Sequence, residues 1–86
     1  MCKKYSYADI IRLVIKQASE NSGILVSDIN IDNNIFDDLG MDEVDFWDFI
    51  ISLEDTFELE LDQDEDENIN TIQDAINLVK MKVDKL

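Results

Sequence analysis

The sequence predicts an all-α domain. Three stretches repeat apolar residues every three or four positions, which is the spacing of one face of a helix. Two of them follow a capping box, in which a serine or threonine precedes an acidic residue by three positions. The chain has no proline, and alternation typical of a strand occurs only in the brief stretch 57–61. We therefore expect helices joined by loops.

Length and charge limit what the chain does. Its 86 residues, 45% of them hydrophobic, suffice for one small core, so we expect residues 1–86 to form a single domain. The net charge of −14 repels nucleic-acid phosphates and anionic membrane surfaces. Every lysine and arginine lies before residue 17 or after residue 79, so the middle of the chain is purely acidic. We expect protein partners with basic surfaces, and no nucleic acid or membrane.

The cysteine and histidine content bears on compartment and catalysis. The single cysteine, Cys2, cannot close an internal disulfide, and the first residues form no apolar segment typical of secretion. We therefore expect a cytoplasmic protein. There is no histidine for acid–base chemistry or to activate Cys2, so no enzyme is expected.

The first helix is predicted over Tyr7–Asn21. Ser6 and Asp9 form its capping box, and Gly23 is a typical residue at which a helix stops. The segment 24–39 contains too many Asp and Asn residues to continue as helix. We expect a long loop pinned to the core by its apolar residues, which are Leu25, Ile29, Ile31, Ile35 and Phe36.

Three further helices are predicted after the loop. Asp42 is the expected cap of a helix over Glu43–Glu58, which has the strongest helical pattern in the sequence. An acidic connection then contains one short helical turn at Asp66–Ile69. The last helix follows a capping box of Thr71 and Asp74, and its buried stripe is predicted to contain Ile72, Ala75, Ile76, Val79 and Val83.

The helix over 43–58 has two apolar faces. At roughly 100° per residue, one sector about 80° wide holds the predicted core face, namely Phe46, Phe49, Ile50, Leu53 and Phe57. A second stripe lies roughly 130° away, and acids flank it. It consists of Val44, Trp47 and Ile51. Either the loop 24–39 covers Trp47, or the stripe is exposed as a docking surface with a charged rim.

Several motifs together resemble the acyl carrier protein family. They are Phe-Asp-Asp-Leu-Gly-Met-Asp-Glu-Val at 36–44, Leu-Glu-Asp-Thr-Phe at 53–57 and Ile-Gln-Asp-Ala-Ile at 72–76. Their order and spacing match the family over about residues 35–79. The resemblance implies an acyl-carrier-protein-like four-helix bundle with a long loop after the first helix and a short third helix. It also implies a role in fatty-acid, polyketide or peptide assembly.

One position departs from the family pattern. Family members attach 4′-phosphopantetheine to a serine that follows the aspartate of the motif, and Glu43 follows Asp42 here, with Val44 next. A carboxylate forms only a labile mixed anhydride and no stable phosphodiester, so we expect no attachment and no cofactor. A working carrier with 4′-phosphopantetheine is the alternative, if Glu43 replaces a native serine or if another residue, such as Ser52 or Thr56, is modified.

The resemblance also indicates which residues meet a partner. The family's partner-recognition helix corresponds to 43–58, and its contact positions correspond to Val44, Trp47, Asp48, Ile51, Glu54 and Asp55. Trp47 is bulkier than the small aliphatic residue usual at that position, which suggests a different set of partners. Glu43 either stabilises the helix N-terminus or keeps a negative charge near the place of the family's phosphate.

The acidic residues are compatible with two other functions. The segment 62–73 resembles a calcium-binding loop, but Glu67 stands where glycine is needed and Gln73 where a bidentate glutamate is needed. We expect at most weak divalent binding at Asp62, Asp64 and Asp66. A nucleic-acid mimic is compatible with the charge without being specifically indicated. We expect a monomer, with a weak dimer through the Trp47 stripe as the alternative.

Overall fold

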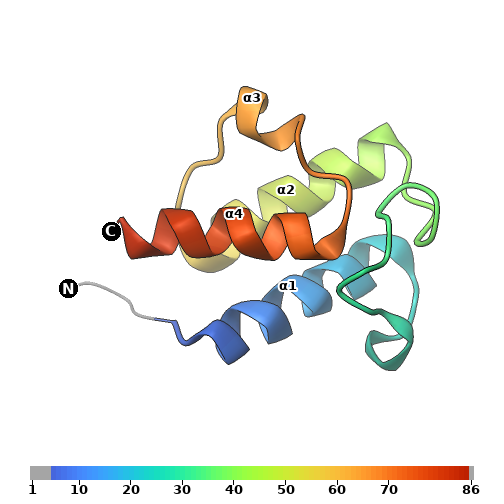
Figure 1. Cartoon of the computed structure of the whole chain (residues 1–86). Coiled ribbons are helices and arrows are strands. Elements are labelled where there is room, and N and C mark those ends of the chain that lie inside the picture. The colour runs from blue at the N-terminus through green and yellow to red at the C-terminus, as the bar shows by residue number, and fades with distance from the viewer. Residues whose placement is uncertain (1–4, 86) are drawn as a thin grey trace.

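The computed structural model describes residues 5–85, except the side chains of Gln63 and Asp66 (Figure 1). Its elements are α1 (Tyr7–Ser22), a 3-10 turn η1 (Val26–Asp28), α2 (Glu43–Phe57), α3 (Gln63–Asp66) and α4 (Ile72–Asp84). The all-α prediction is confirmed. In the part of the chain that is described, the only strand-like pairing is an isolated bridge between Asn34 and Thr71.

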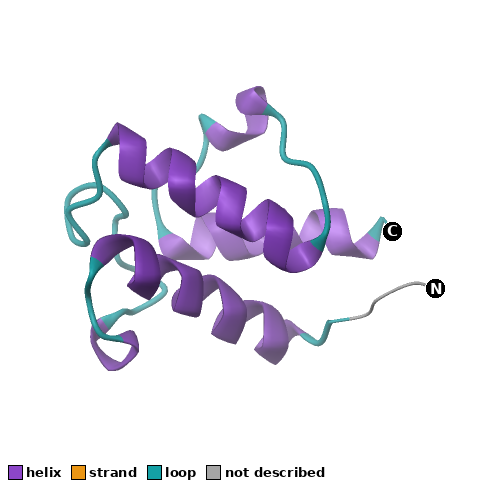
Figure 2. Cartoon of the chain, turned by 180° about the vertical axis from the view of Figure 1, so that it is seen from behind, coloured by secondary structure: helices purple, strands orange, loops and turns teal. Residues whose placement is uncertain are grey.

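The bundle itself is built from three helices rather than the predicted four. α1 packs against both α2 and α4, and α2 also contacts α4 (Figure 2). α3 is a single turn in the connection from α2 to α4, and it stands above the three long helices (Figure 1). The prediction of this turn at Asp66–Ile69 is wrong by three residues. The helix ends at Asp66 because the next residues lead Ile69 into the core, where it is buried.

The helix ends follow the predicted capping. The Ser6 hydroxyl accepts a hydrogen bond from the Asp9 amide, and the Asp9 carboxylate accepts one from the Ser6 amide. Thr71 and Asp74 form the same reciprocal pair ahead of α4. These bonds satisfy N–H groups that have no partner within the helix. Gly23 ends α1 with φ +79°, a left-handed conformation that glycine adopts without strain.

The C-terminal end of α2 differs slightly from the prediction. The helix ends at Phe57, and Glu58 is its cap in a left-handed conformation with φ +55°. The expected helix 43–58 was therefore one residue too long. The chain turns at Glu58, so the stretch 57–61 forms no strand, and Leu61 is buried four residues after the helix ends.

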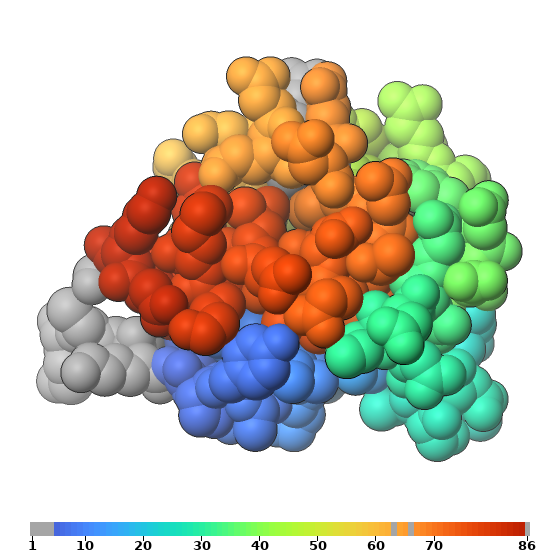
Figure 3. Space-filling view, viewed as in Figure 1, coloured from blue at the N-terminus to red at the C-terminus, as the bar shows by residue number. Residues whose placement is uncertain are grey.

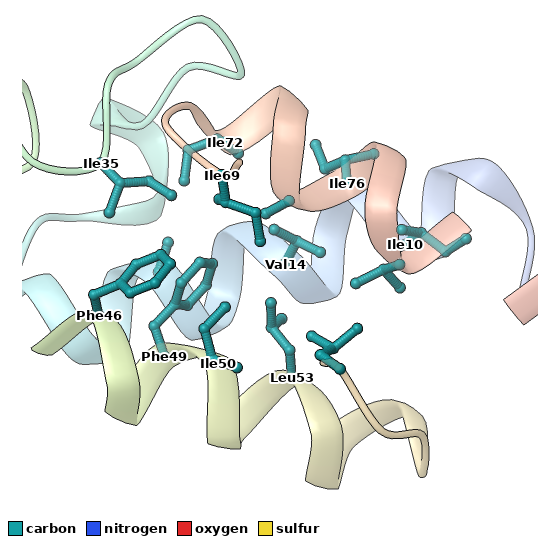
Figure 4. Packing of buried hydrophobic residues seen from close by; sticks show 14 of the residues in the cluster. Ile10, Val14, Ile35, Phe46, Phe49, Ile50, Leu53, Ile69, Ile72 and Ile76 are labelled. Carbon is teal, nitrogen blue, oxygen red and sulfur yellow. The ribbon is translucent and has the colours of Figure 1, made fainter. Parts of the chain in front are cut away.

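The core lies between the three long helices. The predicted core face of α2 is confirmed, because Phe46, Phe49, Ile50, Leu53 and Phe57 are all buried. Figure 4 shows Phe46, Phe49, Ile50 and Leu53 pointing toward residues of α1 and α4, among them Val14 and Ile76. The stripe predicted for α4 is buried as well. Each large apolar side chain removed from water in this way contributes about 1.5–3 kcal/mol to folding.

The loop between α1 and α2 closes one end of the bundle (Figure 3). Ile29 and Ile35 hold it to the core as predicted, and Ile31 is partly buried against it. Leu25 does not, because it is 68% exposed. Phe36 is 38% exposed, and its ring packs on the buried ring of Phe46. The apolar pattern of the loop therefore overestimated how much of it is buried.

Candidate partner-binding surface

The start of α2 is held by contacts from the preceding loop. Met41 is buried, and its amide donates a hydrogen bond of 3.2 Å to the carbonyl of Ile35. Gly40 precedes it with φ +70°, which turns the chain toward the helix. The Asp42 carboxylate then accepts a 2.9 Å hydrogen bond from the Asp45 amide and caps α2 as predicted. Glu43 is thereby fixed as the first helical residue, exposed to solvent.

Asn34 organises this loop. Its side-chain oxygen accepts hydrogen bonds from the amides of Phe36 and Asp37, at 2.9 and 2.8 Å. Its own amide donates to the Asp38 carboxylate at 2.7 Å. Sequence reasoning counted Asn34 only as one of many loop-forming residues. The Asn-x-x-x-Asp spacing was the available signal, because Asn and Asp side chains bond nearby backbone groups in turns.

The loop is also tied to the start of α4. The Ile35 amide donates to the carbonyl of Asn70 at 2.8 Å, and the Gln73 amide donates to the carbonyl of Ile31 at 2.8 Å. The Ile72 amide donates to the carbonyl of Asn33 at 3.1 Å. These bonds link the loop to a helix that is far away in the sequence. The segment in front of α2 is therefore fixed by the bundle as a whole.

The second apolar stripe of α2 faces solvent. Val44, Trp47 and Ile51 are 67%, 38% and 51% exposed, and we call these three residues the α2 stripe. The alternative that the loop covers Trp47 is wrong. Three large apolar side chains on successive turns of one helix form a continuous exposed patch, which is typical of an interaction site.

The aromatic part of the stripe rests on the core. The Trp47 ring meets the ring of buried Phe46 at a centroid distance of 6.4 Å and an angle of 62°. Phe46 in turn contacts Phe36 of the loop, with ring centroids 5.2 Å apart. Phe36 is 38% exposed, so an exposed aromatic ring of the loop lies beside the same helix. Sequence reasoning placed Phe36 among the core anchors and missed this role.

The charges around the stripe are acidic. Glu43, Asp48 and Asp55 are exposed. Glu54 is half-buried, and its carboxylate accepts a 3.0 Å hydrogen bond from the amide of Leu61. Glu54 therefore also holds the chain that leaves α2. No lysine or arginine occurs between residues 17 and 79, so neither α2 nor its loops carry a cation.

A comparison with protein families identifies the domain. Residues 12–79 match the model of the family described as "Phosphopantetheine attachment site". The chain belongs to this family. The match spans most of α1, the loop, α2, α3 and the first part of α4, and it confirms the relationship to the acyl carrier proteins. Such domains carry 4′-phosphopantetheine when the attachment serine is present, and they are not catalytic.

The start of α2 offers no hydroxyl group for a phosphodiester bond. The first turn consists of Glu43, Val44, Asp45 and Phe46, none of which has a hydroxyl group. Ser52 is half-buried in the middle of the helix, and its hydroxyl donates a 2.8 Å hydrogen bond to the carbonyl of Asp48. The residues present therefore do not fit a phosphodiester attachment at the N-terminus of α2.

The described side chains of the acidic connection form no assembled metal site. Asp62 and Asp64 are exposed, and the side chain of Asp66 lies outside the described residues. Among the side chains that are described, no three carboxylate, thiol or imidazole groups meet in a way that could hold a metal ion.

In the same described range, no helix is long and apolar enough to span a bilayer.

Proposed function

We propose that this protein is a carrier-like binding protein without the phosphopantetheine serine, which docks on basic surfaces of partner proteins through α2. The observation that carries the proposal is the exposed α2 stripe of Val44, Trp47 and Ile51 on a helix without any cation. A partner that offers an apolar pocket surrounded by lysine or arginine complements both properties.

The contact of Trp47 with a core residue supports a role in binding. Trp47 is held against Phe46, so little side-chain freedom is lost when a partner covers it. Large aromatic residues at the centre of an interface supply most of its binding energy. The indole is too large for a pocket that fits a small aliphatic residue, so we propose partners with a wider pocket than those of typical carriers.

Glu43 replaces the attachment serine in this proposal. It carries a negative charge in the first turn of α2, where the helix dipole and free N–H groups stabilise an anion. A fixed carboxylate there lets the protein engage carrier-dependent enzymes without cargo. The alternative is a working carrier, in which a different residue is modified or Glu43 stands in place of a native serine. The family match favours this alternative over any unrelated function.

The intact mass of the chain separates the two functions. The parent and Glu43→Ser are incubated with coenzyme A and a broad-specificity phosphopantetheinyl transferase, and each is weighed by mass spectrometry. We expect the parent to keep its mass and the serine variant to gain the prosthetic group. A gain by the parent contradicts the proposal and requires the attachment site to be mapped.

The docking surface is tested in the Glu43→Ser background with the same transferase as the partner. Adding Ile51→Ala or Asp48→Asn should slow the modification about tenfold, since each removes part of the docking face. Leu25→Ala and Asp28→Asn are the matched controls, because both residues are exposed on or beside η1, outside α2. Equal rates for the α2 and η1 variants would show that the stripe is not the docking site.

A further inference from the structure

The connection from α2 to α4 contains a short acidic segment between two buried residues. Residues 62–68, which we call the acidic strap, include α3 and five acids, which are Asp62, Asp64, Glu65, Asp66 and Glu67. Leu61 before it and Ile69 after it are 8% and 3% exposed. Burial of these two side chains anchors the ends of the strap. Because like charges repel, the middle needs an attraction of its own to stay close to the bundle.

Among the side chains that are described, that attraction comes from the ion pair between α3 and α4. The Lys82 ammonium lies 2.6 Å from the Glu65 carboxylate, and the two side chains are only 21% and 25% exposed. The pair Lys80–Asp84, at 2.8 Å, differs in two ways. It joins residues of the same helix, and its side chains are 46% and 62% exposed. Ion pairs as exposed as Lys80–Asp84 contribute little to stability. A pair that is less exposed to solvent is screened less by salt, and when it joins two elements it holds them together.

Both partners stay charged over the whole physiological range. The hydrogen bond from Lys82 holds the pKa of Glu65 below its usual value of 4.5. The same bond raises the pKa of Lys82 above its usual value of 10.5, and the nearby carboxylate of Asp62 acts in the same direction. Lys82 is thus a single cation facing two acids of the strap.

The strap forms one wall of a hollow on α4. The hollow has a volume of about 260 Å³, and Glu65, Asn68 and Ile69 line it on the side of the strap. Leu78 and Met81 line it on the side of α4. Glu65 therefore belongs both to the ion pair and to the wall. Movement of the strap away from α4 would widen the hollow and expose its apolar side chains.

We propose that the Glu65–Lys82 ion pair is a latch that holds the acidic strap closed against α4. When the latch is broken, the repulsion among the strap acids favours a local opening between Leu61 and Ile69, and the three long helices stay folded. This inference does not depend on the proposed partner surface, because α2 contributes no residue to the pair or to the hollow.

Amide hydrogen exchange of the full chain tests the latch. The Glu65 and Asn68 amides donate to the carbonyls of Asp62 and Glu65, at 3.0 and 3.2 Å, so their exchange reports on strap opening. We expect Lys82→Met to speed their exchange about threefold or more and to leave core amides of α1 unchanged, because the opening is local. Lys80→Met is the matched control, since it removes the same charge from the same helix, and it should leave the strap unchanged.

The charge-swapped pair Glu65→Lys with Lys82→Glu completes the test. It restores the ion pair, so the exchange of the strap amides should return toward that of the parent. The latch is excluded if Lys82→Met and Lys80→Met give the same strap exchange. It is also excluded if Lys82→Met speeds exchange in α1 as much as in the strap, because the pair then contributes to global stability only.

Discussion

Phe46 and Trp47 are neighbours in α2, and their ring centroids lie 6.4 Å apart. The two rings nevertheless face different surroundings, because Phe46 is 8% exposed and Trp47 is 38% exposed. One ring belongs to the core and the other to the surface. Since consecutive residues of a helix point about 100° apart, a single helix can present a packed face and an exposed face. The contact between the rings supports the exposed face on the core.

Substitutions at these two residues should therefore have different effects. Phe46→Ala removes a buried ring and should lower the free energy of unfolding by about 3–5 kcal/mol. Trp47→Ala removes a partly exposed ring, and the loss should be about 1 kcal/mol or less. Urea denaturation monitored by circular dichroism measures both values, and similar losses would show that Trp47 belongs to the core.

The reciprocal cap of α4 should contribute measurably to stability. Thr71→Ala removes the hydroxyl that accepts the Asp74 amide and should cost about 1 kcal/mol of unfolding free energy. Thr71→Ser keeps the acceptor and should cost much less. Thermal denaturation of the two variants is the measurement. An equal loss in both would mean that the methyl group of Thr71 matters and its hydroxyl does not.

Asp74 should make the stability depend on pH at the acid end. Hydrogen bonds from the Asn70 and Thr71 amides hold the pKa of its carboxyl below the usual 3.8. As the pH falls, the Asp74 carboxyl of the unfolded chain takes up a proton before that of the folded chain. The stabilisation of the folded chain by the ionised carboxylate is therefore complete above pH 3.8 and is lost as the pH falls toward the pKa of the folded chain. Asp74→Asn should therefore be less stable than the parent at pH 7, and the difference should shrink below about pH 4.

The comparison of these two chains across pH isolates the cap from the overall charge. Protonation of the other acids relieves repulsion in the parent and in Asp74→Asn alike. Urea denaturation at several pH values gives the difference in unfolding free energy between the two chains directly. A stability difference that stays constant down to pH 2 would contradict the role given to the Asp74 carboxylate.

Gly40 should tolerate Asn better than Ala. Its φ of +70° is unfavourable for residues with a Cβ, and no atom lies within 4 Å of the place where that Cβ would be. The cost of Gly40→Ala is therefore conformational and should be about 1–2 kcal/mol of unfolding free energy. Gly40→Asn should cost less, because Asn adopts this conformation more readily. Chemical denaturation checks the order, and the reverse order would point to a steric cause.

The sequence by itself determined the helices and the core. Capping boxes at Ser6 and Thr71 and the apolar face of α2 are local patterns, so spacing along the chain was enough to find them. The same holds for the lack of cations between residues 17 and 79, and for the presence of Glu43 after Asp42. Backbone hydrogen bonding and amphipathic periodicity act within a few residues, which is why they could be read without a structure.

Only the tertiary structure decided which apolar residues remain exposed and what holds the connections. Trp47 is exposed because the loop is hydrogen-bonded to the start of α4 at Ile35 and Gln73 and leaves this side of α2 uncovered. α3 ends before Ile69, because the chain turns there to bury the Ile69 side chain in the core. The pairing of Glu65 with Lys82 joins residues 17 positions apart, and no local pattern encodes it. Such contacts depend on how the helices pack, and packing is a property of the whole chain.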